Sequence, residues 1–418
     1  MPKASPFHER TQPLCTSYRW KTWAGYHAVA SYDICHEREY NACRQGAGLI
    51  DVSPLYKYDI QGPDAAAFLS RVTVRDIRKL KVGRVVYLCW TDDRGKIMDD
   101  GTCMRLGETH YRLTAAEPSF HWLCHHAFGF EVQVIDRGHD LAALALQGPT
   151  SRDVLRQVCD ADVDQLKFFG LQQAAFNGFS GHISRTGYTG DLGYEIWVDK
   201  ASALVLWDEL MGAGAPFNIQ PAGLDALDVC RIEAGFVMAG VDYVGAHEAL
   251  VESQKSSPFE LGLGWTVKLE DRPPCVGHRA LAAEREQGSL WALVGLEIDW
   301  NETEALYGEY GLPPSLSGNA WRSPLPVYGH GKVQVGRASS GVWSPILKKN
   351  LALATIEANY ARPGTTLEIE MTVEWSRRTV AVQVVHLPFF DPPRKKALVE
   401  EREKEPAPAL ADDIFSTP

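Results

Sequence analysis

At residues 184–196 the chain reads Ser-Arg-Thr-Gly-Tyr-Thr-Gly-Asp-Leu-Gly-Tyr-Glu-Ile, with a glycine at every third position from Gly187. Glycine tolerates positive φ angles and the close approach of a ligand, so this run predicts a tight turn. After it, Tyr194 and Ile196 alternate with Glu195 and Trp197, which is the period-2 pattern of a β-strand. The Glu195 carboxylate is therefore expected to be half buried. Because burying it bare is very costly, it needs a partner, either in the fold itself or in a ligand.

The composition is typical of a soluble globular protein with more than one domain. The chain has 418 residues, of which 45% are hydrophobic and 23% are charged, and this length exceeds one ordinary core. The net charge of −11 and the lack of a basic stripe argue against nucleic-acid binding. Residues 1–6 show no secretory signal, and apolar runs such as 141–146 are too short to span a bilayer. We therefore expect a cytoplasmic protein without membrane contact.

The sequence also argues against metals and dinucleotide cofactors. Nine cysteines at irregular spacing indicate reduced thiols. The single Cys/His cluster, at residues 124–126, lacks the ligand spacing of a zinc site. No Gly-x-Gly-x-x-Gly follows a predicted strand, and no Walker loop is present. We expect no flavin, nicotinamide or metal.

Periodicity outlines the first two thirds of the chain. It predicts a strand at 84–89 and helices at 33–45, 65–72, 202–211 and 221–236. The run Asp99-Asp100-Gly101 is typical of a turn, with residues 102–106 as the returning strand of a hairpin.

The last third changes character to short strands separated by glycine and proline. Strands are predicted at 294–298, 334–338, 351–358, 366–371 and 379–385, which fits a small antiparallel barrel or sandwich. Residues 301–326 are predicted to be an inserted loop. Residues 392–418 are charged and contain proline, as flexible tails often do.

Several further motifs accompany the glycine-rich run in the order found in one known family. They lie at 48–53 (Gly-Leu-Ile-Asp-Val-Ser), 94–100 (Arg-Gly-Lys-Ile-Met-Asp-Asp), 145–149 (Ala-Leu-Gln-Gly-Pro), 221–234, 258–269 and 339–345. Together with 184–196, these segments resemble the glycine cleavage T-protein (aminomethyltransferase) family. The resemblance implies an α+β fold, a three-lobed cloverleaf with folate in a central channel. Residues 1–280 would form two intertwined folate-binding lobes, and residues 281–391 a C-terminal antiparallel β-barrel.

Carried over position by position, the resemblance also implies a site. Tyr87, Tyr188, Glu195 and Arg231 would line a tetrahydrofolate site, and Asp100 would be the catalytic carboxylate. Glu195 can accept two adjacent pterin N–H groups, and the tyrosine rings can flank the flat ligand. A carboxylate such as Asp100 beside the reactive folate nitrogens can stabilise developing positive charge and direct a proton.

The residues themselves leave simpler interpretations open for part of this site. Arg231 could form a helix-surface ion pair with Asp228, three residues earlier. Asp99 and Asp100 could both be solvated turn residues, since aspartate is common in turns. In the resemblance, the second aspartate occupies the catalytic position, and alternation along a strand allows only one of the pair to face the channel.

Some segments depart from the glycine cleavage enzymes. Those enzymes end in Pro-Phe-Tyr-Arg, whereas residues 388–391 here are Pro-Phe-Phe-Asp, and the family's Asn-Ala stretch is replaced by Thr-Ala-Ala-Glu at 114–117. The Phe-Phe-Asp-Pro ending looks more like the folate-dependent demethylase branch, which includes dimethylsulfoniopropionate demethylase. Trp20, Trp23 and Tyr26 could hold a methylated sulfonium or ammonium by cation–π attraction, or could simply be core.

The main functional hypothesis is a tetrahydrofolate-dependent methyltransferase or demethylase that acts on a small methylated substrate and yields methyl- or methylene-tetrahydrofolate. One alternative is the glycine cleavage aminomethyltransferase, which would need a lipoyl carrier protein as partner. The others are a non-enzymatic folate-binding iron–sulfur assembly protein and a regulatory paralogue that has lost activity. The cysteine motif of the iron–sulfur relatives is absent here. No motif fixes the one-carbon donor.

Overall fold

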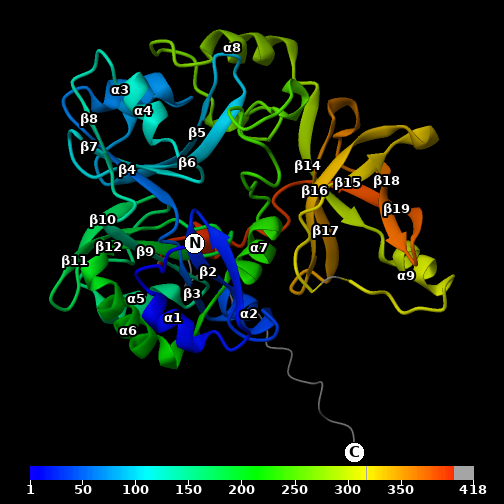
Figure 1. Cartoon of the computed structure of the whole chain (residues 1–418), viewed down its shortest axis with the longest axis horizontal. Coiled ribbons are helices and arrows are strands. Elements are labelled where there is room, and N and C mark those ends of the chain that lie inside the picture. The colour runs from blue at the N-terminus through cyan, green and yellow to red at the C-terminus, as the bar shows by residue number, and fades with distance from the viewer. Residues whose placement is uncertain (317, 400–418) are drawn as a thin grey trace, which may run out of the picture.

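The structure, a computed structural model, describes residues 1–316 and 318–399. Figure 1 shows three lobes: two sheets with their helices on one side, and a barrel set apart on the other. A short N-terminal part precedes them, formed by α1 (His8–Leu14), β1 (Arg19–Trp23) and β2 (Tyr26–Ser31). Within the described residues, no helix has the length and apolarity that a membrane crossing needs.

The first lobe is a five-stranded antiparallel sheet in the order β5-β6-β7-β4-β8. Its elements are β4 (Tyr56–Gln61), α3 (Ala65–Val72), β5 (Arg84–Thr91), β6 (Ile97–Arg105), β7 (His110–Ala115), α4 (Phe120–His126) and β8 (Gln133–Asp136). Apolar side chains of α3 and α4, including Phe68 and Leu123, pack on the sheet residues Leu88 and Trp90. The opposite face of β6 is thereby left to the interior between the lobes.

The second lobe is a six-stranded sheet in the order β10-β11-β12-β9-β3-β13. Its strands are β3 (Ala47–Asp51), β9 (Leu141–Gln147), β10 (Leu171–Ala175), β11 (Ser180–Ser184), β12 (Gly193–Asp199) and β13 (Ile219–Pro221). One face packs on α5 (Ser151–Val158) and α6 (Ala203–Gly214), and the other on α2 (Glu37–Gln45) and α7 (Leu224–Glu233). Tyr194 and Ile196 point to α5 and α6, whereas Trp197 packs on the α7 side. By alternation, Glu195 also faces α7.

The third lobe is a closed barrel of six strands in the order β14-β17-β16-β15-β18-β19, with every pairing antiparallel. Its elements, with the helices that precede and follow its first strand, are α8 (His278–Gln287), β14 (Trp291–Ile298), α9 (Trp300–Gly308), β15 (Leu325–Tyr328), β16 (Gln334–Ser344), β17 (Lys349–Glu357), β18 (Thr366–Val373) and β19 (Ser376–Val385). Four of the five strands predicted from the sequence for this region lie within these strands, and the fifth, at 351–358, runs one residue beyond the end of β17.

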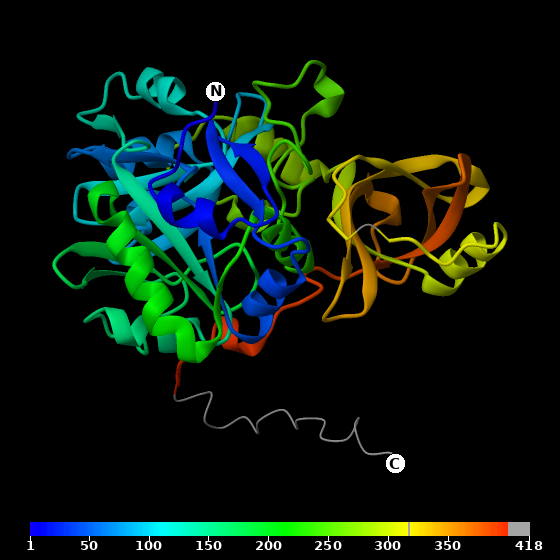
Figure 2. The ribbon, with the colours of Figure 1, turned by 60° about the horizontal axis from the view of Figure 1, so that its bottom comes forward.

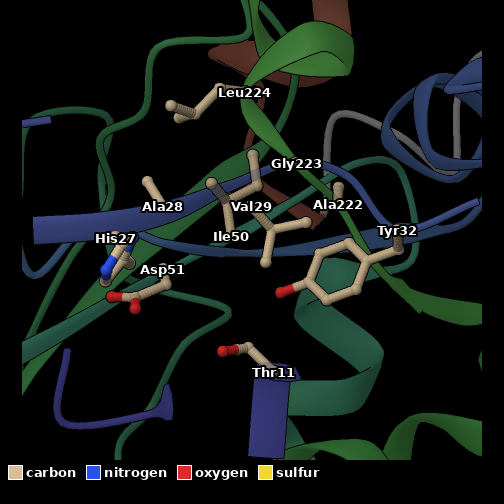
Figure 3. Close-up of a pocket in the computed structure, with 10 residues that line it drawn as sticks. All are labelled: Thr11, His27, Ala28, Val29, Tyr32, Ile50, Asp51, Ala222, Gly223 and Leu224. Carbon is tan, nitrogen blue, oxygen red and sulfur yellow. The ribbon is translucent and has the colours of Figure 1, made fainter. Parts of the chain in front are cut away.

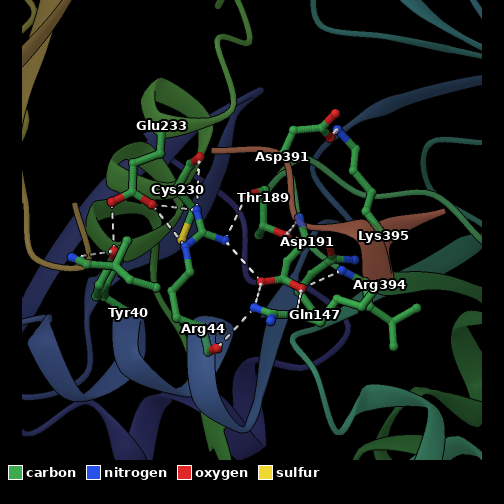
Figure 4. A network of polar contacts seen from close by, with 12 residues as sticks. Tyr40, Arg44, Gln147, Thr189, Asp191, Cys230, Glu233, Asp391, Arg394 and Lys395 are labelled. Carbon is green, nitrogen blue, oxygen red and sulfur yellow. Dashed lines mark hydrogen bonds and ion pairs between the residues drawn. The ribbon is translucent and has the colours of Figure 1, made fainter. Parts of the chain in front are cut away.

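A buried polar junction joins the barrel to the second lobe. Glu233, at the end of α7, accepts hydrogen bonds from Tyr40 at 2.6 Å and from Arg44 at 2.9 and 2.6 Å. Ser344, at the end of β16, donates to the same carboxylate at 2.5 Å. All four residues are buried. Figure 4 shows Tyr40 and Arg44 converging on Glu233.

Three predicted segments are wrong. Asp99, Asp100 and Gly101 lie in the middle of β6, and the turn lies at residues 92–96, where Gly95 has a φ of +73°. The predicted loop at 301–326 contains α9, whose start is capped by Asp299 accepting from the Glu302 N–H at 2.8 Å. The predicted flexible tail begins too early, because Pro393–Lys395 forms a helical turn that packs on the second lobe. Residues 400–418 lie outside the described residues.

Candidate active site

Asp100 is held between two phenols on the inner face of β6. Tyr87, on the neighbouring strand β5, donates to Asp100 Oδ2 at 2.7 Å, and Tyr243 donates to Oδ1. Burial raises the pKa of Asp100, and the hydrogen bonds from Tyr243 and Tyr87 partly offset this. Burial and the adjacent carboxylate raise the pKa of both tyrosines, so both remain neutral donors. The carboxylate is thus oriented at both oxygens, and the residue as a whole is half-buried.

Asp99 is a buried structural carboxylate, which corrects the prediction of a solvated turn. Its side chain accepts hydrogen bonds from the backbone N–H of Asp100 at 2.8 Å and of Glu117 at 2.9 Å. It is 0% exposed, and burial together with the nearby Asp100 charge raises the pKa of Asp99 well above its usual value. Successive residues of β6 point to opposite faces, so Asp99 ties β6 to the loop after β7 and Asp100 faces the interior.

Aromatic rings flank Asp100 in two stacked pairs. The Tyr87 ring stacks on Trp265 with centroids 5.9 Å apart, and the Tyr188 ring stacks on Phe236 at 5.6 Å. The Tyr188 hydroxyl donates to the Val237 carbonyl. Asp100 contributes to the raised pKa of both tyrosines, so the two pairs lie around one carboxylate. Flat apolar rings near a carboxylate suit a flat heteroaromatic ligand.

The glycine-rich run wraps the side-chain amide of Gln147. That amide donates to the Thr186 and Tyr194 carbonyls at 3.3 Å each and accepts from Thr189 at 2.8 Å. A Cβ atom added at Gly187 or Gly193 would lie 2.0 or 2.3 Å from the Gln147 oxygen, so neither position has room for a side chain. The sequence predicted the tight turn but not that Gln147 organises it.

Glu195 follows this loop on β12 and is half-buried. Thr186 donates to its Oε2, and this is the one hydrogen bond that the described residues make to the carboxylate. Burial raises the pKa of Glu195, and the Thr186 bond lowers it in part. No arginine or backbone amide of the described chain pairs with Glu195, so the other oxygen is available to a ligand.

Arg231 is fully buried in a network of carboxylates, rather than lying on a helix surface. It donates to Asp228 at 2.8 Å and to Asp242 at 2.5 Å. Asp228 also accepts from Arg322 at 2.7 Å. The predicted pairing with Asp228 is therefore present, although in the core. Among the described residues, none accepts from Nη2 of Arg231, which is buried. Tyr188 is close enough to Arg231 for each to affect the other's pKa.

The structure places the three N-terminal aromatics in different surroundings. Trp20 lies against the His8 and His27 rings, at 5.3 and 6.2 Å. Tyr26 contacts the His139 ring nitrogen at 3.1 Å. Only Trp23 packs on the core cluster that Tyr188 also borders. The three rings do not form one cage in this structure.

The cavity in Figure 3, beside Asp51 and the hydroxyls of Thr11 and Tyr32, has a volume of about 10 Å³, the size of one water molecule. Across residues 1–316 and 318–399, His, Cys, Asp and Glu side chains nowhere form the groups of three or more that could hold a metal ion.

Sequence reasoning missed Tyr243, Trp265 and Phe236. Phe236 follows the end of α7, Tyr243 lies in irregular chain, and Trp265 lies in the 3-10 turn Gly264–Thr266. In none of these places does a periodic pattern mark the side chain as part of a site. Tyr243 and Trp265 reach strands β6 and β5 across more than 140 residues of chain. A lone aromatic in a loop carries no local indication of such a contact.

Comparison with known proteins decides the family. The GCVT N-terminal domain matches residues 12–271, and the Glycine cleavage T-protein C-terminal barrel domain matches residues 292–391. The chain belongs to the glycine cleavage T-protein family. Its relatives include an aminomethyltransferase of Bacillus mycoides, 33% identical over 359 residues, with 85% of this chain and 89% of the relative covered. An aminomethyltransferase of Halothermothrix orenii is 32% identical over 356 residues, with 84% and 90% covered.

The T-protein fold is shared with a solved structure over nearly the whole length. The crystal structure of glycine cleavage system aminomethyltransferase T from Bartonella henselae aligns with a TM-score of 0.79 and 25% identity, covering 94% of this chain and 99% of that one. The predicted fold, with its C-terminal barrel, is confirmed. So is the predicted enzyme class, a tetrahydrofolate-dependent methyl- or aminomethyltransferase of the T-protein family.

Proposed function

We propose that this protein transfers a one-carbon unit to tetrahydrofolate, with an aminomethyl group on a lipoyl carrier protein as donor. The observation that carries the proposal is the pair of half-buried carboxylates on the inner faces of the two sheets. Asp100 has both oxygens oriented by phenols, whereas one oxygen of Glu195 has no donor among the described residues. One carboxylate is thus prepared for chemistry and the other for orienting a ligand.

The residues present fit tetrahydrofolate. Glu195 would accept the adjacent N–H groups of the pterin, and the Tyr87 and Tyr188 rings would flank the ligand. Nη2 of Arg231 is a buried donor without an acceptor in the part of the chain that the structure describes, and a carbonyl or carboxylate of the ligand would satisfy it. When bound, tetrahydrofolate supplies the nucleophilic nitrogens that accept the one-carbon unit. We propose that no flavin, nicotinamide or metal takes part.

Asp100 would act on charge and protons at those nitrogens. A carboxylate in a water-poor site stabilises developing positive charge more strongly than it could in water. Its Oδ atoms can also receive the proton that a nitrogen loses when it forms a bond to carbon. Tyr87 and Tyr243 keep the carboxylate in place, so no reorganisation is needed during the reaction.

The donor is assigned from the relatives, and a second candidate rests on the C-terminal end. The aminomethyltransferases named above match over 84–85% of this chain, which favours the aminomethyl donor. Asp391 stands where the glycine cleavage enzymes have arginine, and it pairs with Lys395 and Lys396 at 3.0 Å each. This departure favours transfer of a methyl group from a small sulfonium or amine, as in the demethylase branch.

A donor assay separates the two candidates. Purified protein is given tetrahydrofolate with either an aminomethyl-loaded lipoyl carrier protein or a methylated sulfonium or tertiary amine. We expect methylene-tetrahydrofolate and ammonia from the first mixture only. Methyl-tetrahydrofolate from the second mixture would replace the aminomethyl assignment with the demethylase one. No folate product from either would contradict one-carbon transfer to folate.

Removing the Tyr87 hydroxyl should shift the pH profile. A hydrogen bond donated to a carboxylate favours its charged form, so Tyr87→Phe should raise the pKa of Asp100 further. The acid limb of turnover against pH is then expected at higher pH than in the wild type. Tyr188→Phe is the control, because its hydroxyl donates to a carbonyl instead. An acid limb at the same pH in wild type and Tyr87→Phe would show that Asp100 does not set it.

A further inference from the structure

The chain returns from the barrel to the second lobe after its last strand. β19 ends at Val385, and residues 388–397, here called the C-terminal strap, run back and pack against that lobe. Figure 2 shows this red segment leaving the barrel and ending beside the second lobe. The strap therefore contacts the lobe that carries the glycine-rich loop.

Arg394 of the strap forms an ion pair with the glycine-rich loop. Its Nε and Nη2 donate to the two oxygens of Asp191 at 2.7 Å each, a bidentate pair (Figure 4). The Asp191 side chain is 0% exposed and the Arg394 side chain 27%. Paired, parallel N–H···O bonds fix orientation as well as distance. Asp191 lies between Tyr188 and Glu195, so the loop is held at its centre.

The contact is reciprocal. Arg185, at the start of the loop, donates through Nη2 to three carbonyl oxygens of the strap, those of Arg394, Lys395 and Ala397, at 3.3, 3.1 and 2.8 Å. The Arg185 residue is 1% exposed. The loop thus holds the strap backbone while the strap holds the loop side chain.

Arg44 and Phe390 also join the glycine-rich loop to the strap. Arg44 donates to the Thr189 carbonyl of the loop at 2.9 Å. The Phe390 ring lies 4.4 Å from the Arg44 guanidinium carbon and 5.9 Å from that of Arg394. The Phe390 N–H donates to the Glu233 carbonyl at 2.8 Å, which anchors the strap to α7.

Lys395 connects the strap to the rings of the site. It is 9% exposed, and its Nζ lies 5.3 Å from the centroid of Phe236. Phe236 is the ring on which Tyr188 stacks. The strap therefore supports the loop through Asp191 and the Tyr188 stack through Phe236.

We propose that Arg394 is a positioning residue for tetrahydrofolate binding, and that the C-terminal strap is part of the folate site without touching the ligand. A loop with three glycines loses much conformational entropy when it is ordered. The contacts with the strap order the loop before folate binds, so the binding step no longer carries this entropy cost. The strap contacts therefore raise the affinity for folate. The inference rests on the proposed role of Tyr188 and Glu195 in holding folate.

The test measures tetrahydrofolate affinity by calorimetry in three full-length variants. Arg394→Ala should raise the Kd about tenfold, the scale of a lost charge-assisted hydrogen bond. Arg394→Lys, which keeps the charge but loses the bidentate fork, should raise it about threefold. Lys396→Ala is the matched control, since Lys396 is an exposed cation of the strap that pairs with Asp391, and its Kd should equal that of the wild type.

Two further readouts separate positioning from general damage. Arg394→Ala should also lower the melting temperature, because it leaves the buried Asp191 carboxylate with Arg44 alone at 3.7 Å. Arg394→Lys keeps a cation beside Asp191, so it and Lys396→Ala should melt close to the wild type. With saturating folate, turnover of Arg394→Ala should remain near wild type, so the loss appears in KM and not in kcat. If Arg394→Ala does not fold, the Kd of Arg394→Lys alone tests whether Arg394 positions the folate site.

The outcomes also separate this inference from the proposed function. An unchanged Kd in Arg394→Lys and Arg394→Ala, with a weakened Glu195→Gln, would overturn the strap inference and leave the folate site intact. An equal loss in Lys396→Ala would also overturn it. Unchanged affinity in Glu195→Gln itself would overturn the folate site.

Discussion

Replacing Asp100 by asparagine should lower the single-turnover rate by about 10²–10⁴-fold, the usual scale for a positioned acid or base. The substitution keeps the shape and lets Tyr87 and Tyr243 retain hydrogen bonds, but it removes the charge and the basic oxygen. Tetrahydrofolate affinity should change much less, because Asp100 is not the residue that orients the ligand. Single-turnover rates at saturating folate provide the measurement.

Asp99→Asn is the matched control for this prediction. An amide at position 99 would turn an N–H₂ group toward the Glu117 or the Asp100 backbone N–H, so the free energy of unfolding should fall by about 1–3 kcal/mol. The folded fraction should still turn over within about tenfold of the wild-type rate. A larger kinetic loss in the Asp99 variant than in the Asp100 variant would show that the two roles are reversed.

Glu195→Gln should weaken tetrahydrofolate binding by about 1–3 kcal/mol, the range for losing a charged hydrogen-bonding partner, which corresponds to roughly 5–150-fold in Kd. The fold should be unaffected, since Thr186 can still donate to the remaining side-chain oxygen. Calorimetric titration with tetrahydrofolate measures the change.

Asp199→Asn serves as the control on the same strand, because Asp199 is exposed and caps the following turn by accepting from Ala201. Its folate affinity should match the wild type. Equal affinities for wild type and Glu195→Gln would remove Glu195 from the site.

The sequence pattern predicted correctly those parts of the fold that depend on neighbouring residues. The alternation of Tyr194 and Ile196 with Glu195 and Trp197 placed each side chain on its correct face of β12. Strand spacing and frequent turn residues placed five of the six barrel strands. β15 (Leu325–Tyr328) was missed because it is short and contains Pro326, which reads as loop.

The wrong predictions concern residues whose contacts lie far away in the sequence. Asp99 is of a residue type common in turns, and its burial depends in part on the Glu117 N–H, 18 residues away, which the local sequence does not reveal. The alternative of an ion pair between Arg231 and Asp228 is present, although buried and not on a helix surface. Nothing in the sequence near α7 shows that Arg231 also pairs with Asp242. Asp242 in turn accepts from Ser339 and Ser340 of the barrel. Without other information, a polar residue is predicted to lie on the surface. Here the barrel covers this part of α7, so its polar residues are buried.

The junction at Glu233 has a consequence for how the chain behaves as a whole. Its carboxylate is shared by Tyr40 and Arg44 from the second lobe and Ser344 from the barrel. Separating the barrel from the second lobe would expose the Glu233 carboxylate and remove the hydrogen bond from Ser344. The second lobe alone would therefore lack part of the hydrogen bonding that this buried charge has in the whole chain. The two family domains meet at about residues 271–292 in sequence, but this is not a line along which the molecule divides. Recombining halves from different family members would therefore succeed only where position 344 can still donate to this glutamate.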